Sequence, residues 1–353
     1  PDPVIDPAQG ASPEDYFNTV LYTGNGSTKS ITDVGFPSDF TWIKSRNAAL
    51  SHILCDSLRI SSEGTFDTLI SNSIAAEFDS TTLSGGVTPT ATGFDLDYGG
   101  GWSGVNDNAV NYVAWNWKAN GSGVSNTDGS ITSTVSANTT SGFSIVSYTG
   151  TGTAGTVGHG LSSAPDMVIV KSRTFADNWE VYHSALPTPA TDLIRLNGTA
   201  GYTTAGGFWN GGTTSSVFGI SSYAQLNQSG DDFIAYCFHS VEGFSKFGKY
   251  TGNGSTDGVF VYTGFRPSFV MVKSYTAGEH WNIPVFTSDT NGTMNTLSPN
   301  LSNAERTMDQ NPAVDFVSNG FKIRTSDANY NSNGGSYIYM AFAENPFKYA
   351  NAR

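Results

Sequence analysis

Apolar residues occur along this chain in short segments that are rich in aromatic and β-branched side chains and that often alternate with polar residues. Gly, Asn, Ser and Pro turns separate these segments about every 8 to 15 residues. Alternation with a period of two is typical of strands, and the sequence shows no sustained helical period. The pattern therefore predicts an all-β protein built from antiparallel β-sandwiches of jelly-roll or lectin-like type.

Three copies of one sequence pattern follow each other along the chain. Each copy opens on a Tyr-Thr-Gly-x-Gly motif, which begins at Tyr22, Tyr148 and Tyr250. A lysine that closes an apolar strand follows 22 or 23 residues later, as Lys44, Lys171 and Lys273. Each copy ends on an aromatic segment, at 112–117, 233–238 and 337–342. The repetition predicts three tandem sandwich domains.

The composition between the repeats sets the expected boundaries. Residues 1–15 contain four prolines and are expected to form an extended N-terminal arm, because proline fixes φ and removes an amide donor. The three sandwiches are expected at 16–119, 142–241 and 242–353, the last with a C-terminal tail. Residues 120–141 are rich in Gly, Ser, Thr and Asn and are interpreted as a linker that carries an edge strand.

Charge and composition exclude several classes of protein. The 353 residues carry a net charge of −13, with 13% charged and 38% hydrophobic residues, so the chain has enough apolar side chains for packed cores. The acidic balance argues against nucleic-acid binding, which needs clustered Lys and Arg. No apolar run reaches the roughly 20 residues of a membrane helix. Cys55 and Cys237 lie in apolar segments and are interpreted as buried free thiols.

The sequence contains no convincing catalytic constellation. His52, His183 and His280 are interpreted as related positions of the three repeats, which favours a structural role over a catalytic one. Asp95 and Asp97 share one strand face and could act as the carboxylate pair of a glycosidase. The same two residues with Asn106, Asp107 and Asn108 could instead supply oxygen ligands to calcium. Solvated turn residues are the simpler interpretation, so we predict no enzyme and no obligatory cofactor.

Three aromatic residues lie in Gly-, Asn- and Ser-rich contexts rather than in alternating strands. They are Trp102, Trp209 and Tyr330. Lectin-like sandwiches stack exposed aromatic rings on sugars, so these three residues are the candidate glycan-binding site.

Five segments of the chain are also similar to a known group of proteins: 16–27, 40–47, 112–119, 130–140 and 343–353. They resemble a repeat region of virion structural proteins of tailed bacteriophages, notably marine and cyanobacterial phages, which are usually described as tail fibre or tail proteins. The resemblance covers nearly the whole chain from Tyr16 onward. It implies a virion component without established catalytic residues.

The resemblance and the residues together give the functional expectation. We expect a non-enzymatic protein of the virion exterior, tail-fibre-like, that contacts other virion proteins and host-surface glycans but neither binds nucleic acid nor inserts into a membrane. The resemblance implies a homo-oligomer such as a trimer, although three repeats in one chain could instead mimic threefold symmetry within a monomer. A capsid decoration or head-fibre protein anchored by residues 1–15 is the first alternative. A glycan-cleaving depolymerase or a secreted lectin is the second.

Overall fold

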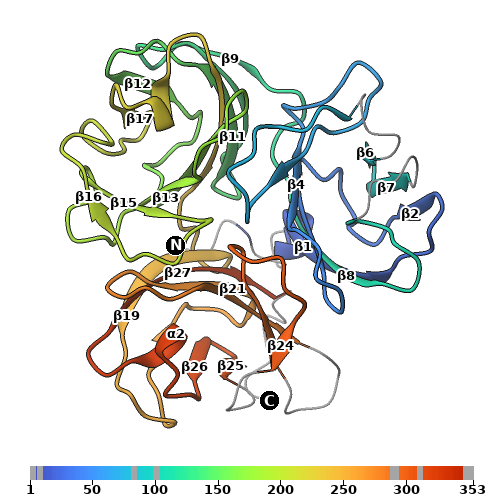
Figure 1. Cartoon of the computed structure of the whole chain (residues 1–353), viewed down its shortest axis with the longest axis vertical. Coiled ribbons are helices and arrows are strands. Elements are labelled where there is room, and N and C mark those ends of the chain that lie inside the picture. The colour runs from blue at the N-terminus through green and yellow to red at the C-terminus, as the bar shows by residue number, and fades with distance from the viewer. Residues whose placement is uncertain are drawn as a thin grey trace.

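The structure is a computed structural model that describes Ile5 and residues 11–80, 86–97, 104–286, 294–307 and 313–344. The three repeats form three lobes arranged around a common centre (Figure 1). Every pair of neighbouring strands within the sheets is antiparallel, and each lobe contains one large sheet and one small sheet. The predicted all-β sandwich fold is confirmed.

The three large sheets share one strand order, in which the last strand of each repeat lies between its first and a middle strand. In repeat 1 the order is β1 (Phe17–Thr23), β8 (Asn111–Trp117), β3 (Phe40–Ser45), β4 (Ile53–Asp56) and β5 (Leu69–Ile70). Its small sheet contains β2 (Lys29–Ile31), β7 (Gly93–Asp97) and β6 (Gly86–Thr90).

Repeat 2 has the same order with additional strands at both ends. Its large sheet runs β16 (Thr203–Thr204), β15 (Asp192–Arg195), β14 (Glu180–His183), β13 (Met167–Ser172), β18 (Asp232–Phe238), β11 (Phe143–Thr149), β10 (Ser133–Asn138) and β9 (Val124–Asn126). Its small sheet contains β12 (Gly155–Gly158) and β17 (Val217–Ile220), and helix α1 (Ala224–Asn227) precedes β18.

Repeat 3 also contains one large sheet and one small sheet. Its large sheet runs β19 (Ser245–Thr251), β27 (Ser336–Ala343), β21 (Pro267–Ser274), β22 (Trp281–Phe286), β23 (Met294–Leu297) and β24 (Arg306–Thr307). Its small sheet contains β20 (Phe260–Tyr262), β26 (Gly320–Ile323) and β25 (Val314–Val317), and helix α2 (Ala328–Asn331) precedes β27.

The two segments expected outside the sandwiches contribute to the packed structure. Within 120–141, β10 pairs with β11 and β9 pairs with β10, so this segment extends the large sheet of repeat 2 by two strands. Of residues 1–15, the structure describes Ile5 and 11–15. Ile5 is buried in the central core, and Pro13–Asp15 form a 3-10 turn, η2, directly before β1.

The repeated Tyr-Thr-Gly motif has the same structural role in each copy. Tyr22 stacks on Tyr112 with ring centroids 5.1 Å apart, and its hydroxyl donates to the Val105 carbonyl over 2.7 Å. Tyr148 and Tyr250 make the equivalent stacking and hydrogen-bond contacts. The glycine of the motif allows a close backbone approach, because a Cβ on Gly24 would lie 2.2 Å from the Asp107 carbonyl oxygen.

Each repeat buries two apolar faces. One face of its large sheet packs on its own small sheet and forms a core that belongs to that repeat alone. The opposite face joins a single central core to which all three repeats contribute. At its centre lie Trp117, Phe238 and Phe342, one from each closing strand, with ring centroids 6.3, 5.6 and 6.1 Å apart. The three repeats are therefore not independent domains, because they share one central core.

The repeated lysines connect neighbouring repeats in cyclic order. The Lys44 ammonium donates to the Ser302 carbonyl in repeat 3 over 3.2 Å, and that of Lys171 donates to the Ile74 carbonyl in repeat 1 over 3.3 Å. Lys273 donates to the Thr199 carbonyl in repeat 2 over 2.6 Å. Burial lowers the pKa of each of the three lysines to about 8. Three equivalent interfaces thus close the chain into a pseudo-threefold ring.

A second contact recurs at each interface, with different chemistry. The carbonyl two positions after each lysine accepts a backbone hydrogen bond from the same neighbouring repeat that the lysine contacts. The pairs are Arg46–Glu305, Arg173–Glu77 and Tyr275–Tyr202. The first two are also ion pairs, whereas the two tyrosine rings pack edge to face with centroids 6.1 Å apart. The backbone geometry is therefore conserved between the interfaces while the side chains differ.

Candidate functional site

The structure overturns two of the three predicted glycan-stacking residues. Trp209 is 1% exposed, packs edge to face on Tyr182 and donates its indole N–H to the Asp192 carbonyl over 3.1 Å. Tyr330 is 0% exposed, and its hydroxyl lies 3.0 Å from the Thr296 hydroxyl. The prediction of exposed rings is wrong at these two positions, because the loop of Trp209 and the short helix α2 that carries Tyr330 direct the rings into the cores of repeats 2 and 3. Trp102 lies outside the described residues.

The acidic pair of repeat 1 lies where the alternation predicts. Asp95 and Asp97 share the outward face of β7, while Phe94 and Leu96 point into the core. Asp95 is half-buried and Asp97 is exposed, and the Asp97 carboxylate accepts a hydrogen bond from the Thr28 hydroxyl over 3.4 Å. These are the surroundings of solvated strand residues.

Asn106 holds the Tyr-Thr-Gly loop instead of facing outward as a calcium ligand. It is 1% exposed; its amide oxygen accepts from the Asn25 N–H over 3.0 Å, and its amide group donates to the Ser27 carbonyl. Asn227 and Asn331 take the same position in the other repeats and accept from Thr151 and Asn253. Because all three repeats use this asparagine to hold the loop, Asn106 has a structural role. The expectation that it is a calcium ligand is therefore corrected.

The neighbouring residue Asp107 is half-buried, and its backbone N–H donates to the Tyr112 hydroxyl over 3.0 Å. Ser332 and Tyr337 make the equivalent contact in repeat 3. Across the residues that the structure describes, no group of three or more His, Cys, Asp and Glu side chains is placed to hold a metal ion. The calcium hypothesis therefore gains no support from the part of repeat 1 that is described.

The histidines do not occupy equivalent positions, which corrects the sequence interpretation. The backbone N–H of His52 donates to Asn72, and the residues that make this contact in the other repeats are Trp179 and Trp281. The indole groups of both tryptophans donate to a carbonyl of the neighbouring repeat. His52 therefore stands where the other repeats have a tryptophan that bridges an interface.

Hydrogen bonds hold the buried histidine rings in place. His52 accepts from the Trp42 indole over 2.9 Å, and burial lowers its pKa well below the usual range, with the Lys44 charge adding to the effect. His183 accepts from the Ala185 N–H and donates to the Tyr339 carbonyl of repeat 3, and burial lowers its pKa to about 4. Both rings are neutral structural groups at pH 7.

Both cysteines are free and fully buried, as predicted. Burial raises the pKa of the Cys55 thiol to about 12 and raises that of Cys237 as well. A thiol must ionise to act as a nucleophile, so these environments suppress reactivity.

A buried ionic network joins repeats 1 and 2. Arg59 contacts Asp56 at 2.6 Å and Glu77 at 3.0 Å, and Glu77 also pairs with Arg173 at 2.7 Å. The Tyr236 hydroxyl donates to the Asp56 carboxylate over 2.7 Å. Buried charges are tolerated when they are paired and hydrogen-bonded, and here the partners come from both repeats. The network fixes how these repeats dock.

Glu180 is a buried carboxyl that the sequence analysis missed. It lies on β14 with a fully buried side chain, and its single ion-pair partner among the described residues is the half-exposed Arg195, 3.2 Å away. Burial raises the pKa of Glu180 to about 7. Repeats 1 and 3 have Ile53 and Asn282 at this position. The sequence did contain a signal for this group. Glu180 is a carboxylate at an inward-facing strand position where repeat 1 has the apolar Ile53.

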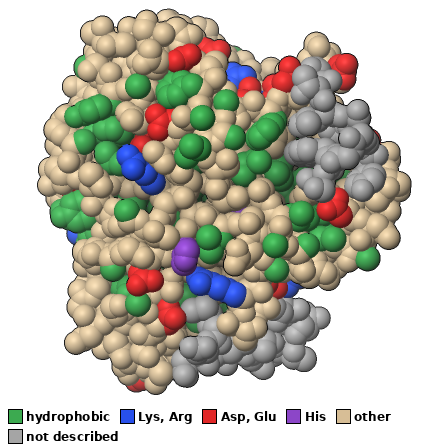
Figure 2. Space-filling view, in the orientation of Figure 1, with side chains coloured by type: hydrophobic (Ala, Val, Ile, Leu, Met, Phe, Trp, Pro, Cys, Tyr) green, Lys and Arg blue, Asp and Glu red, His purple; other side chains and the backbone are tan. Residues whose placement is uncertain are grey.

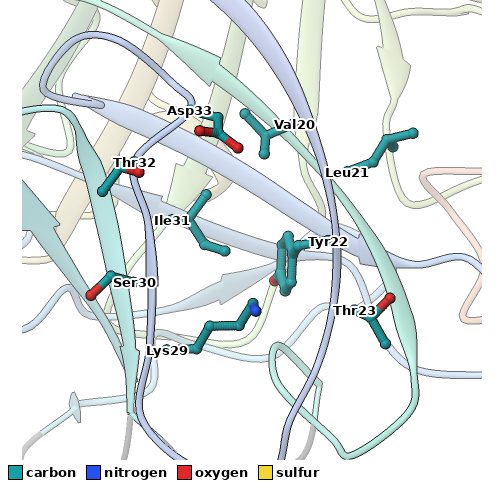
Figure 3. A pocket seen from close by; sticks show the side chains of 9 residues that line it. All are labelled: Val20, Leu21, Tyr22, Thr23, Lys29, Ser30, Ile31, Thr32 and Asp33. Atoms are coloured by element: carbon teal, nitrogen blue, oxygen red, sulfur yellow. The ribbon is translucent and has the colours of Figure 1, made fainter.

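A groove of about 280 Å³ lies in repeat 1 between β1 and β2 (Figure 3). Residues 20–23 line one wall and residues 29–33 line the other, and the loop 24–28 connects the two walls. Val20, Tyr22 and Ile31 point into the gap, and the Lys29 side chain extends toward Tyr22 (Figure 3). At the far end, the Asn18 amide donates to the Asp33 and Val34 carbonyls over 3.2 Å each.

The sister repeats differ at the equivalent position. In repeat 2, β10 pairs with β11, and Ile131 and Ser133 donate to the Thr156 and Gly158 carbonyls on β12. In repeat 3, Gly248 takes the position of Val20, and a Cβ on Gly248 would lie 2.8 Å from the Tyr339 hydroxyl, so the Tyr339 ring occupies the place of the Val20 side chain. Among the described strands, β1 and β19 are both sheet edges, whereas β10 covers β11 in repeat 2.

The surface viewed in Figure 2 carries few charged side chains, and these are scattered rather than gathered in one patch. No helix within the described ranges is long and apolar enough to cross a membrane. The largest exposures among the apolar side chains on described strands include Tyr262 at 65% and Leu21 at 53%.

Comparison with known proteins gives a family but no relative of known activity. No curated protein sequence and no solved structure matches the chain. One family model, described as "Domain of unknown function (DUF7483)", matches residues 12–346. The match begins beside η2 and ends after β27, so it spans all three repeats. The chain therefore belongs to the DUF7483 family.

Proposed function

We propose that the chain is a non-enzymatic structural protein of the exterior of a bacteriophage virion, with a tail-fibre-like position. The observation that carries the proposal is the closure of three sandwiches around one aromatic core, which makes a rigid body from a single chain. A rigid, sparsely charged β-scaffold suits an exposed particle component. The resemblance of segments such as 112–119 to phage structural proteins supports the same role.

The use of the titratable groups supports a non-catalytic role. The buried histidines bind backbone and indole groups, the thiols are buried, and the Arg59 network is paired. A catalytic site needs such groups to converge on a pocket that a substrate can enter. Here His183 and Arg59 contact neighbouring repeats, and the two thiols lie in the apolar cores of their own repeats.

The ring of three repeats also affects how many copies of the chain we expect at each position in the particle. A homotrimeric fibre would bring three copies of one fold around an axis, and this chain does so with three repeats. We therefore propose one chain per position in the particle, in place of a homotrimer. Ile5 is buried in the core of its own chain, which favours the tail position over a capsid protein anchored by residues 1–15.

Host-surface glycans remain part of the proposal, at a different place. Phe260 and Tyr262 are 48% and 65% exposed and are alternate residues of β20, so their rings share one outward face. Aromatic rings of this kind can stack on sugars. Replacing both with Ala is expected to weaken binding to host polysaccharide, whereas Val124→Ala, at another exposed position, is expected to have no effect.

Immunogold electron microscopy of purified phage particles tests the proposal. Antibodies raised against the chain are expected to label tail appendages, and antibody pre-adsorbed with the protein is the control. Labelling of the capsid would favour the decoration alternative. Absence of the chain from particles, checked by mass spectrometry of the same preparation, would contradict any virion role.

A further inference from the structure

The groove of repeat 1 borders a strand edge that can accept another strand. Among the described strands, β1 pairs with β8 alone and forms the edge of its sheet. Gly24 donates to Val110 and Lys118 donates to Tyr16, so the even-numbered residues of β1 direct their backbone groups toward β8. The backbone groups of Thr19, Leu21 and Thr23 consequently point away from β8. They are available for a further antiparallel ladder.

Repeat 2 shows which occupant this geometry takes. There β10 lies along β11 with Ser133 opposite Tyr148 and Val135 opposite Val146, and Ile131 reaches the small sheet. Tyr148 and Val146 correspond to Tyr22 and Val20, because both pairs lie opposite equivalent residues of the closing strand. Val157 likewise corresponds to Ile31. The walls of the groove are therefore the counterparts of the surface that β10 covers.

The wall of the groove that β2 forms differs from its counterpart in repeat 2, and the difference favours a particular kind of bound segment. Gly155 in repeat 2 admits the Ser130 side chain, since a Cβ on this glycine would lie 2.7 Å from the Ser130 hydroxyl. The corresponding residue of repeat 1 is Lys29, whose side chain extends into the groove (Figure 3). A strand seated here meets a positive charge where the segment that precedes β10 presents Ser130. An acidic side chain at that position is complementary to it.

We propose, independently of the virion role, that the β1–β2 groove binds an extended segment of a partner polypeptide by strand addition to β1. The segment resembles β10 in having β-branched or small residues at alternate, inward positions, and it carries a carboxylate that contacts Lys29. Backbone hydrogen bonds to the outward groups of β1 provide the affinity, and the inward residues and the carboxylate provide the specificity.

The test uses the whole chain and two peptides with the sequence of residues 129–138, one with Ser130→Asp and one with Ser130→Lys. Fluorescence anisotropy is expected to show saturable binding, about two- to fivefold tighter for the aspartate peptide at low salt, as befits one exposed ion pair. Backbone amide resonances of Leu21 and Thr23 are expected to shift. Shifts confined to β11, or equal binding of both peptides and of a scrambled control, would overturn the proposal.

Two protein variants sharpen the result. Leu21→Pro removes an outward N–H of β1 and is expected to lower affinity at least tenfold, whereas Leu21→Thr keeps the N–H and is expected to bind normally. Lys29→Glu is expected to reverse the preference between the two peptides. This second variant decides the question if the proline variant does not fold, and an unchanged preference in Lys29→Glu would contradict the proposal.

Discussion

At the scale of single residues, the local context of an aromatic side chain is a poor guide to its exposure. Apart from Phe208, the nearest neighbours of Trp209 in sequence are glycines and polar residues, yet its ring is buried and its indole N–H donates to the Asp192 carbonyl. The loop supplies few apolar neighbours, and the core of repeat 2 supplies the rest. Such a contact joins residues that are distant in sequence, so no local pattern reveals it.

The burial of Trp209 makes a direct prediction. Trp209→Ala should lower the free energy of unfolding by about 3–5 kcal/mol, because it removes a large buried side chain and leaves a cavity. Tyr262→Ala, at a 65% exposed position, should change it by less than about 0.5 kcal/mol. Urea unfolding followed by circular dichroism measures both. A near-neutral Trp209→Ala would restore the surface role that the structure excludes.

Glu180 predicts a dependence of stability on pH. Burial raises its pKa to about 7, whereas an unfolded glutamate titrates near 4.5, so the folded chain binds the proton more tightly. Its contribution to stability is therefore fully present below about pH 4.5 and is lost as the pH rises through 7. Glu180→Gln should be more stable than the parent at pH 8 by about 1–2 kcal/mol and similar to it at pH 4.5.

The matched control for this experiment is the exposed Glu242, for which Glu242→Gln should leave the pH profile unchanged. Chemical denaturation of the three proteins at pH 4.5, 6 and 8 provides the comparison. A Glu180→Gln variant that is less stable than the parent at pH 8 would mean that the pairing with Arg195 outweighs the cost of burying the charge.

At the scale of elements, the same strand order accommodates different neighbours beside the first strand of each repeat. Repeat 2 places the β9–β10 hairpin there, whereas β1 and β19 are edges among the described strands and repeat 1 has a groove beside β1. The alternation in 130–135 correctly predicted a strand in the supposed linker. Its partner strand and its contact with the small sheet depend on docking between distant segments, which the alternation does not encode.

The packing of Tyr339 against β19 can be tested at Gly248. A Cβ on Gly248 would lie 3.0 Å from two carbon atoms of the Tyr339 ring, which is closer than ordinary van der Waals contact. Gly248→Ala should therefore destabilise the chain by about 1–2 kcal/mol. Gly206→Ala meets nothing within 4 Å and should be nearly neutral. Thermal melts of the two variants measure the difference, and equal melting temperatures would show that Tyr339 does not pack closely on Gly248.

At the scale of the whole molecule, the sequence revealed the three repeats but not their arrangement as a ring. The repeated Lys44, Lys171 and Lys273 mark equivalent positions, but only the structure shows that each donates to a neighbouring repeat. Trp117, Phe238 and Phe342 were likewise recognisable as closing-strand aromatics, while their meeting at one centre follows from the docking of three sheets. One family model spans all three repeats.

The central claim is that the three repeats form one cooperative body, and differential scanning calorimetry of the intact chain tests it most directly. Because the repeats share the central core and three interfaces, we predict a single transition whose calorimetric enthalpy equals its van't Hoff enthalpy. Phe238→Ala, a substitution in one repeat, should lower the temperature of that whole transition. Three separable transitions, with only the one belonging to repeat 2 shifted by this substitution, would contradict the account.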